Sequence, residues 1–220
     1  MAGILFIISA PSGSGKSTLV AHLRSLVEGL EFSISYTTRA PRGSETDGRE
    51  YHFTQRDAFE GMVEHGEFLE WAEVFGNYYG TAVSALEHAR ATGKDLLLDI
   101  DVQGALQVMR KLPEAVPIFI VPPSPKVLEM RLRNRSEAEH MDSKEVIERR
   151  LMQAHAEVKQ VWDYKYALVN DVLDQATAEM RAVVLYERGT RDGVTTVAES
   201  CLTKARSPRL RAALKSFGVE

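Results

Sequence analysis

Short apolar runs alternate with amphipathic segments along most of this chain. Continuous apolar runs of this length are typical of strands buried on both faces of a sheet, and they lie at residues 4–9, 32–35, 95–99, 116–121 and 166–170. Spacings of three and four between apolar residues predict helices at 16–27, 82–91, 102–111, 126–134, 144–161 and 172–186. This alternation predicts an α/β fold, with an open parallel sheet flanked by helices.

Two stretches interrupt the alternation. Residues 36–81 are rich in Gly, Tyr, Thr, Arg and Glu and contain short alternating strand patterns, which predict a small antiparallel insertion suited to holding a second substrate. Residues 136–143 form a polar gap between two arginine-bearing helical segments, as is typical of the tip of a mobile lid. After residue 187 the pattern weakens into a basic tail, for which a helix packed on the body is favoured over a nucleic-acid-binding arm.

Composition narrows the class of protein. The chain has 220 residues, 44% hydrophobic and 26% charged, which is typical of a globular protein with one well-buried core. A net charge of −4 gives no overall field that attracts nucleic acid or membrane, so an anionic substrate must meet locally gathered Arg and Lys. The single cysteine, Cys201, cannot form an internal disulfide. We therefore expect a cytoplasmic protein without an obligate protein partner, and we expect Trp71 and Trp162 to be core anchors.

The first predicted strand runs directly into a glycine-rich segment that is typical of a phosphate-binding loop. Its residues are Ser12, Gly13, Ser14, Gly15, Lys16, Ser17 and Thr18. The glycines allow successive N–H groups to face one anion, Lys16 can reach the outer phosphates, and the Ser17 hydroxyl can bind Mg²⁺. The helix that follows directs its positive end at the same anion. Ala10 replaces the first glycine of the usual pattern, which a negative φ at that position tolerates.

Acidic and basic side chains then supply further candidate chemistry. Asp99 and Asp101 end a predicted strand and share a face, at the sheet edge where ligands bind in α/β proteins. Asp99 is a candidate magnesium ligand, directly or through water. Arg39 and Arg42 can fork around a phosphate, and tyrosines can add phenolic donors to it.

These segments together resemble the guanylate kinase family, which phosphorylates GMP with ATP. The matching stretches are Ser12–Thr18, FSISYTTRAPRG at 32–43, GREYHF at 48–53, EFLEWAEVFGNYYGT at 67–81, LDIDVQG at 98–104 and VND at 169–171. They occur in family order and span residues 3–186. The resemblance implies a P-loop nucleoside monophosphate kinase fold with a core (3–34, 93–125 and 150–186), a GMP-binding insertion (35–92), a lid (126–149) and a basic tail (187–220).

The resemblance also implies roles for individual residues. The GMP phosphate would be held by Arg39, Arg42, Tyr51 and Tyr79, and guanine would be read by Ser35, Glu70, Thr81 and Asp101. Arg131, Arg135 and Arg150 would close over the transferring phosphoryl group with Lys16 and Arg39, and Asn170 would lie near the ATP base. An ionised Glu70 can accept from N1–H and N2–H₂ of guanine, while hydroxyls of Ser35 or Thr81 can donate to O6.

The implied reaction is in-line phosphoryl transfer with Mg-ATP as donor and no covalent intermediate. We expect no catalytic role for the six histidines. Two alternatives stay open at this point: a guanylate-kinase-like module that binds phosphorylated peptides without catalysis, and a kinase for a phosphorylated sugar on the same scaffold. The intact loop at Lys16 disfavours the first, and the guanine-reading set disfavours the second. Use of dGMP as a further acceptor stays open as well.

Overall fold

The computed structural model describes the backbone of residues 3–139 and 144–219, and the side chains of these residues except 135–139 and 144. The strands are β1 (Leu5–Ser9), β2 (Leu30–Phe32), β3 (Tyr36–Thr37), β4 (His52–Phe53), β5 (Phe68–Val74), β6 (Asn77–Ala82), β7 (Asp95–Asp99), β8 (Val116–Val121) and β9 (Tyr166–Val169). The helices are α1 (Lys16–Leu26), α2 (Arg56–Glu64), α3 (Val83–Thr92), α4 (Val102–Lys111), α5 (Pro125–Glu139), α6 (Lys144–Val158), α7 (Leu173–Glu187), α8 (Thr195–Ser200) and α9 (Pro208–Ser216), with short 3₁₀ turns η1 (Lys159–Asp163) and η2 (Thr203–Ala205).

The main sheet has five strands in the order β2-β7-β1-β8-β9. The β2–β7 and β8–β9 pairs are parallel, and every residue of β1 and β8 is buried. The predicted fold class, a mostly parallel α/β sheet flanked by helices, is confirmed. The predicted strand at 32–35 is wrong in its bounds: β2 ends at Phe32, and the chain then crosses to another sheet at Tyr36.

A second sheet has the strand order β4-β3-β6-β5. Its β3–β6 and β5–β6 pairs are antiparallel, as predicted for this stretch, whereas the short β3–β4 pair is parallel. The α2 helix was not predicted, and its Phe59 ring stacks on Phe68 at 4.4 Å between ring centroids. These two rings lie so close to β6 that a Cβ on Gly80 would be within 2.9–3.0 Å of them, so Gly80 leaves the space that the aromatic cluster fills.

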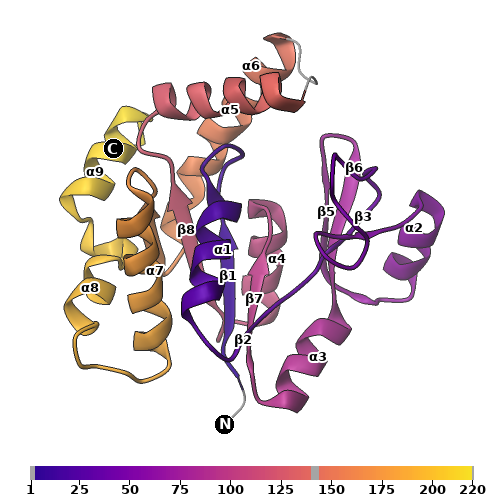
Figure 1. The fold of residues 1–220 in the computed structure, drawn as a ribbon, viewed down its shortest axis with the longest axis horizontal. Helices are drawn as coiled ribbons and strands as arrows, with labels where there is room; N and C mark the ends of the chain where they lie inside the picture. Colours follow the sequence, from indigo (N-terminus) through magenta and orange to yellow (C-terminus); the bar gives the residue numbers. More distant parts are fainter. Residues whose placement is uncertain (1–2, 140–143, 220) are drawn as a thin grey trace. The chain divides into compact units, whose positions relative to one another are not determined.

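The contacts divide the chain into two compact units. Unit 1 consists of Met1–Ile7 and Gly29–Val116, and unit 2 consists of Ile8–Glu28 and Pro117–Glu220. Within unit 2, α1 and α7 pack side by side, and the chain continues from α7 into α8 and α9 (Figure 1). Unit 1 therefore holds the second sheet, and unit 2 holds the glycine-rich loop and the C-terminal helices.

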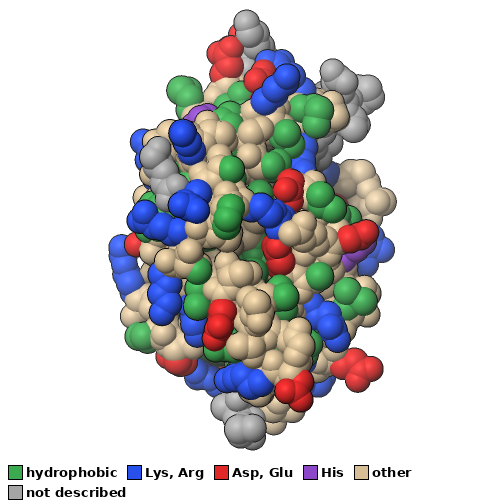
Figure 2. Space-filling view, turned by 90° about the vertical axis from the view of Figure 1, so that its left-hand side faces the viewer, with side chains coloured by type: hydrophobic (Ala, Val, Ile, Leu, Met, Phe, Trp, Pro, Cys, Tyr) green, Lys and Arg blue, Asp and Glu red, His purple; other side chains and the backbone are tan. Residues whose placement is uncertain are grey.

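The C-terminal segment is folded onto unit 2. It extends the β9 edge through hydrogen bonds from Ala167 N to Cys201 O at 2.9 Å and from Thr203 N to Lys165 O at 3.0 Å. The α9 helix buries Leu210 and Leu214, which confirms the predicted packed helix. On the face that carries α8 and α9, Figure 2 shows Lys and Arg side chains interspersed with acidic and hydrophobic ones.

Trp71 and Trp162 are each 39% exposed, so the prediction that they anchor the core is wrong. Trp71 lies on the outward face of β5, and the Trp162 indole packs beneath the Arg206 guanidinium at 4.6 Å. Across the part of the chain that the structure describes, no helix combines the length and apolar character needed to cross a membrane.

Candidate functional site

The glycine-rich loop links the buried β1 strand to the start of α1. Gly13 and Gly15 have φ values of 86° and 82°, in the left-handed region that favours glycine. Gly15 is the N-cap of α1 and offers no side-chain acceptor, and the first turn contains no acidic residue. The first N–H groups of α1 therefore lack a side-chain cap, so they suit an anion at this helix end.

Two side chains from distant parts of the sequence support this loop. Asn170 follows β9 and is only 5% exposed, and its Nδ2 donates to Ser14 O at 2.8 Å. Arg131 on α5 donates from Nη1 to Ser14 O at 3.1 Å and from Nη2 to Asn170 O at 3.0 Å. Burial lowers the pKa of Arg131, against the opposing effect of Asp171. In this structure Asn170 and Arg131 thus hold the loop backbone.

Close packing explains why the loop needs both of its glycines. A Cβ on Gly13 would lie 2.9 Å from Leu132 Cγ and 3.0 Å from Leu128 Cδ1, because α5 packs on the loop. A Cβ on Gly15 would lie 2.6 Å from Asn170 Nδ2. All three distances are shorter than ordinary contacts between heavy atoms. The glycines therefore serve the supporting contacts as well as the backbone conformation.

The other predicted residues of the ATP side are distributed along unit 2. Lys16, Ser17 and Thr18 form the first turn of α1, where Ser17 and Thr18 are exposed. Arg150 is half-buried on α6. Arg135 lies within α5, but its side chain is outside the described residues. The lid tip predicted at 136–143 begins too early, because α5 continues to Glu139, and its residues 140–143 lie outside the described part of the chain.

In unit 1, Arg39 forms a bidentate ion pair that the sequence analysis missed. Its Nη1 donates to Glu45 Oε2 at 2.9 Å, and its Nη2 donates to Glu45 Oε1 at 3.0 Å. Glu45 also accepts from Arg42 N at 2.8 Å, so one carboxylate fixes both predicted arginines. Burial disfavours the charged form of both side chains, but the hydrogen bonds between them favour it. The pKa of Glu45 is therefore lowered and the pKa of Arg39 is raised.

Two predicted tyrosines lie against the same arginine. The Arg39 guanidinium is 5.3 Å from the centre of the Tyr51 ring, and the rings of Tyr51 and Tyr79 meet edge to face at 5.8 Å. Burial, together with the charge of Asp99, raises the pKa of the Tyr51 phenol to about 12, so the hydroxyl keeps its proton as a donor at neutral pH. Arg39, Tyr51 and Tyr79 therefore form one group of donors suited to an anion.

A buried carboxylate lies on the second sheet. Glu70 is 3% exposed, and Thr81 stands opposite it in the β5–β6 register and donates from Oγ1 to Glu70 Oε1 at 2.6 Å. The register shifts between Phe68 and Glu70, so Leu69 is an extra residue of the kind that turns a strand's side chains locally. Burial, reinforced by the charge of Asp101, raises the pKa of Glu70 to about 7 despite the Thr81 hydrogen bond.

Asp101 and a glycine complete the surroundings of this carboxylate. Asp101 is the N-cap of α4 and accepts from Gln103 N at 3.2 Å and from Gly104 N at 3.1 Å. A Cβ on Gly104 would lie 2.2 Å from Glu70 Oε2, so the carboxylate rests directly on the α4 backbone. Gly104 was not among the predicted site residues, and only its place as the last residue of the LDIDVQG stretch at 98–104 could have suggested it.

Ser35 stands apart from this hydrogen-bonded group in the contacts of the described residues. It is 8% exposed, and its carbonyl accepts from His52 N at 2.9 Å. Asp99 ends β7 and is half-buried. The other predicted residues of unit 1 form two clusters, one around Arg39 and one around Glu70.

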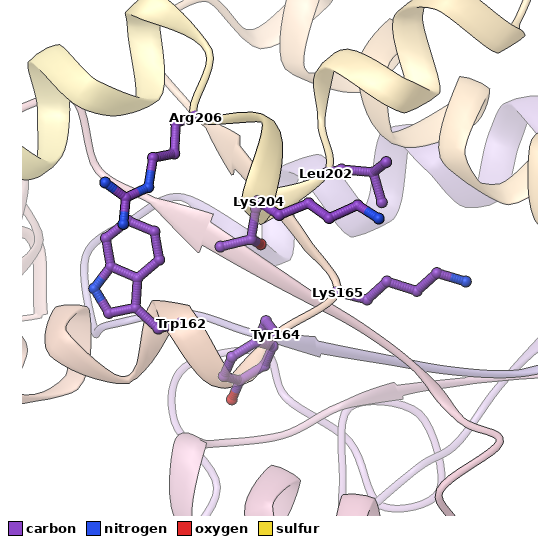
Figure 3. A pocket seen from close by; sticks show the side chains of 7 residues that line it. Trp162, Tyr164, Lys165, Leu202, Lys204 and Arg206 are labelled. Carbon is purple, nitrogen blue, oxygen red and sulfur yellow. The ribbon is translucent and has the colours of Figure 1, made fainter.

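A separate hollow of about 440 Å³ in unit 2 is lined by none of the predicted site residues. Figure 3 shows the Arg206 guanidinium over the Trp162 indole, with Lys165 and Lys204 extending toward the other side. The Lys165 ammonium is paired with Glu187 at 2.8 Å. Two of the three cations here therefore already have partners, and we assign this hollow no role in the chemistry.

A glycine-rich loop between a buried strand of a mostly parallel sheet and an uncapped helix start defines a P-loop nucleotide-binding α/β protein. Comparison with known proteins narrows this class. The family model described as guanylate kinase matches residues 3–187. The chain belongs to the guanylate kinase family.

Individual relatives agree with this assignment. A guanylate kinase of Koribacter versatilis is 53% identical over 99% of this chain and 97% of its own length. A guanylate kinase of Dechloromonas aromatica is 49% identical over 84% of this chain and 89% of its own. The crystal structure of guanylate kinase from Anaplasma phagocytophilum superimposes with a TM-score of 0.69 at 31% identity, covering 90% of this chain and 95% of that one.

Proposed function

We propose that this chain transfers the γ-phosphoryl group of ATP to GMP, giving ADP and GDP. The observation that carries the proposal is the buried Glu70 carboxylate, held by Thr81 and resting on Gly104, in a chain of the guanylate kinase family whose phosphate loop has both glycines and Lys16. An intact loop disfavours the purely peptide-binding alternative, because a non-catalytic module has no use for Lys16 at the outer phosphates.

Guanine is selected because its pattern of hydrogen-bond donors and acceptors matches that of the side chains that contact it. An ionised Glu70 only accepts, so it matches N1–H and N2–H₂ of guanine, whereas adenine presents a ring acceptor that leaves it unpaired. The single proton of the Thr81 hydroxyl is already donated to Glu70. Thr81 therefore orients the carboxylate, and donation to guanine O6 falls to the buried hydroxyl of Ser35. Sites built on such hydrogen bonds reject the wrong partner by ~10⁴ or more.

The phosphate of GMP binds to the group formed by Arg39, Arg42, Tyr51 and Tyr79. Glu45 accepts one bond from each of Nη1 and Nη2 of Arg39, and Ala40 O accepts a second bond from Nη1 at 2.7 Å. A guanidinium has five N–H donors, so these three bonds leave donors for the substrate. The ion pair also holds the Arg39 side chain in one orientation before GMP arrives. Because the side chain is already ordered, binding of GMP loses less conformational entropy.

Phosphoryl transfer then depends on positioning and on charge neutralisation. The attacking phosphate oxygen of GMP carries its charge already, so the reaction needs no general base. The α1 N–H groups and Lys16 hold the ATP phosphates, and Arg150 and Arg135 offset charge on the transferring group. Asn170 and Arg131 contribute by fixing the loop backbone, a role that differs from direct contact with the ATP base or phosphoryl group.

Mg²⁺ fits the oxygen donors that this chain offers. It prefers oxygen ligands and keeps several waters, so a hydroxyl and a carboxylate, direct or through water, suffice together with ATP phosphates. Ser17 is exposed on the first turn of α1, and Asp99 ends β7. When bound with ATP, the ion supplies further neutralisation of the phosphate charge.

The proposal is tested by measuring ADP release from Mg-ATP with GMP, dGMP, AMP, UMP or ribose phosphate as acceptor. We expect turnover with GMP and little with AMP or ribose phosphate. Glu70→Gln should raise KM for GMP strongly, whereas the exposed neighbour on the same strand, Glu73→Gln, should not. Equal use of AMP and GMP by the wild type would refute guanine selection, and an unchanged KM in the Glu70 variant would refute the role of that residue.

A further inference from the structure

Arg209 on α9 contacts three acceptors around the end of β9. Its Nη2 donates to Val169 O at 3.0 Å and to Asp171 Oδ1 at 2.5 Å, and its Nη1 donates to Glu179 Oε1 on α7. Burial would raise the pKa of Asp171, but the hydrogen bonds from Arg209 and Val172 N lower it. One guanidinium from the C-terminal segment thus joins the β9 end to α7 through charge-assisted hydrogen bonds.

The residue between two of these contacts is Asn170. Arg209 binds residues 169 and 171, so it fixes the chain on both sides of the amide that donates to Ser14 O in the phosphate loop. The Asn170 backbone is held as well, because its carbonyl accepts from Arg131 Nη2. The position of Asn170 in turn limits the space beside Gly15, where a Cβ would lie 2.6 Å from Nδ2. A continuous set of contacts therefore runs from α9 to the loop.

The segment that carries Arg209 is itself firmly attached. Residues 201–203 hydrogen-bond alongside 165–167 at the start of β9. Ser207 caps α9, with Pro208 in its first turn, and Phe217 at its end packs edge to face on His155. Arg209 is thus anchored on a short helix whose two ends are fixed, which makes it suitable as a rigid support. The family model matches residues 3–187, so this support lies outside the matched residues.

We propose that Arg209 is a positioning residue for the ATP half of the reaction: it holds Asn170 where that side chain supports the phosphate loop. This inference rests on the proposed function, since it assigns the loop to ATP. Arg209 touches neither substrate. Its loss loosens the loop geometry, weakening ATP binding while the GMP-binding residues of unit 1 keep their own contacts.

The test compares Arg209→Ala with Arg211→Ala, an exposed arginine on the same helix. We expect KM for ATP to rise roughly tenfold in the first variant, equivalent to ~1.4 kcal/mol, with KM for GMP changed much less, and no change in the second. Arg209→Lys should recover part of the loss, because a lysine reaches one acceptor but not all three. Equal rises in the two KM values, or an ATP KM like that of Arg211→Ala, would overturn the proposal.

Two further measurements separate this proposal from its alternatives. Asp171→Asn keeps an acceptor but removes the charge, so it should shift KM for ATP in the same direction by a smaller factor even if Arg209→Ala folds poorly. An unchanged ATP KM in a folded Asp171→Asn protein counts against the proposal. Direct titration of each variant with ATP in the absence of GMP needs no turnover, so it tests Arg209 even if GMP proves not to be the acceptor.

Discussion

Thr81 Oγ1 donates a 2.6 Å hydrogen bond to Glu70 Oε1, and the two residues stand opposite each other in the β5–β6 pair. Because the Thr81 proton points at the carboxylate, one oxygen of Glu70 is fixed while the rest of its acceptor capacity is available. The environment nevertheless disfavours the charge, since burial raises the pKa of Glu70 to about 7. The free protein therefore holds a carboxylate that a ligand with N–H donors would stabilise.

GMP binding should consequently strengthen as pH rises through about 7, because only the ionised Glu70 accepts from both guanine N–H groups. Titration with GMP about one unit below and one unit above that pKa measures the effect, and binding at the lower pH should release a proton. The phosphate of GMP itself titrates near pH 6, so Glu70→Gln serves as the control that retains only the phosphate contribution. Identical pH profiles in wild type and variant would contradict the role of Glu70.

The raised pKa of Glu70 also predicts that the stability of the free protein falls as pH rises, whereas GMP binding strengthens. The unfolded carboxyl titrates at about 4.5 and the folded one at about 7, so the folded state binds more protons between these values and stability falls as pH rises across this window. At 1.36 kcal/mol per unit, the loss approaches ~3 kcal/mol. Glu70→Gln should thus unfold at higher denaturant concentration than the wild type above pH 7, and the difference should vanish below about pH 4.5.

The sequence predicted the main sheet well because its strands are buried on both faces. β7 and β8 have the predicted bounds, since continuous apolar runs leave little freedom. β2 was predicted wrongly because it is a half-buried edge strand. Trp71 was also predicted wrongly, because a large apolar side chain by itself does not tell on which face of a half-exposed strand it lies.

The parts of the candidate site that are formed by a local sequence motif could be predicted. The parts that depend on contacts between residues far apart in the sequence could not. The loop at 12–18 follows from spacing alone. The contact between Asn170 and Ser14 spans 156 positions, and no local pattern indicates it. Glu45 was not predicted as a site residue, because acidic side chains are common on protein surfaces and only the folded chain brings this carboxylate to Arg39. Gly104 was not predicted either, because it contributes no functional group: it matters only because a side chain at this position would occupy the space of the Glu70 carboxylate.

Gly104→Ala should impair the GMP side selectively. Its new Cβ would lie 2.2 Å from Glu70 Oε2, so the carboxylate must move away from its present position. We expect KM for GMP to rise by at least tenfold, as ~1.4 kcal/mol of lost interaction requires, with KM for ATP nearly unchanged. Gly61→Ala on α2 is the matched control, because its Cβ meets nothing within 4 Å and the change favours the helix by roughly 0.5–1 kcal/mol.

Gly13→Ala should impair the ATP side instead. The residue has φ 86°, and a Cβ would lie 2.9 Å from Leu132 Cγ, so the substitution combines backbone strain with a clash against α5. Gly189 has φ 95°, but a Cβ there would meet no atom within 4 Å. Gly189→Ala is therefore the control that introduces backbone strain without a steric clash. ATP titration of both variants should show a large loss only for Gly13→Ala. Comparable ATP affinities would mean that the contact with α5 does not shape the loop.

Lys16→Ala should separate catalysis from acceptor binding. Lys16 begins α1 directly after the Gly15 cap, where an ammonium can neutralise charge on the phosphates of ATP as the γ-phosphoryl group leaves. Losing one such stabilising group costs ~10²–10³ in kcat, whereas GMP titration should be unchanged, because its binding residues lie in unit 1 and Lys16 lies in unit 2. Lys215→Ala, an exposed lysine on α9, is the control for loss of charge. Weakened GMP binding in Lys16→Ala would show that the two substrates are assigned to the wrong units, and full activity would show that the loop does not serve as the phosphoryl donor site.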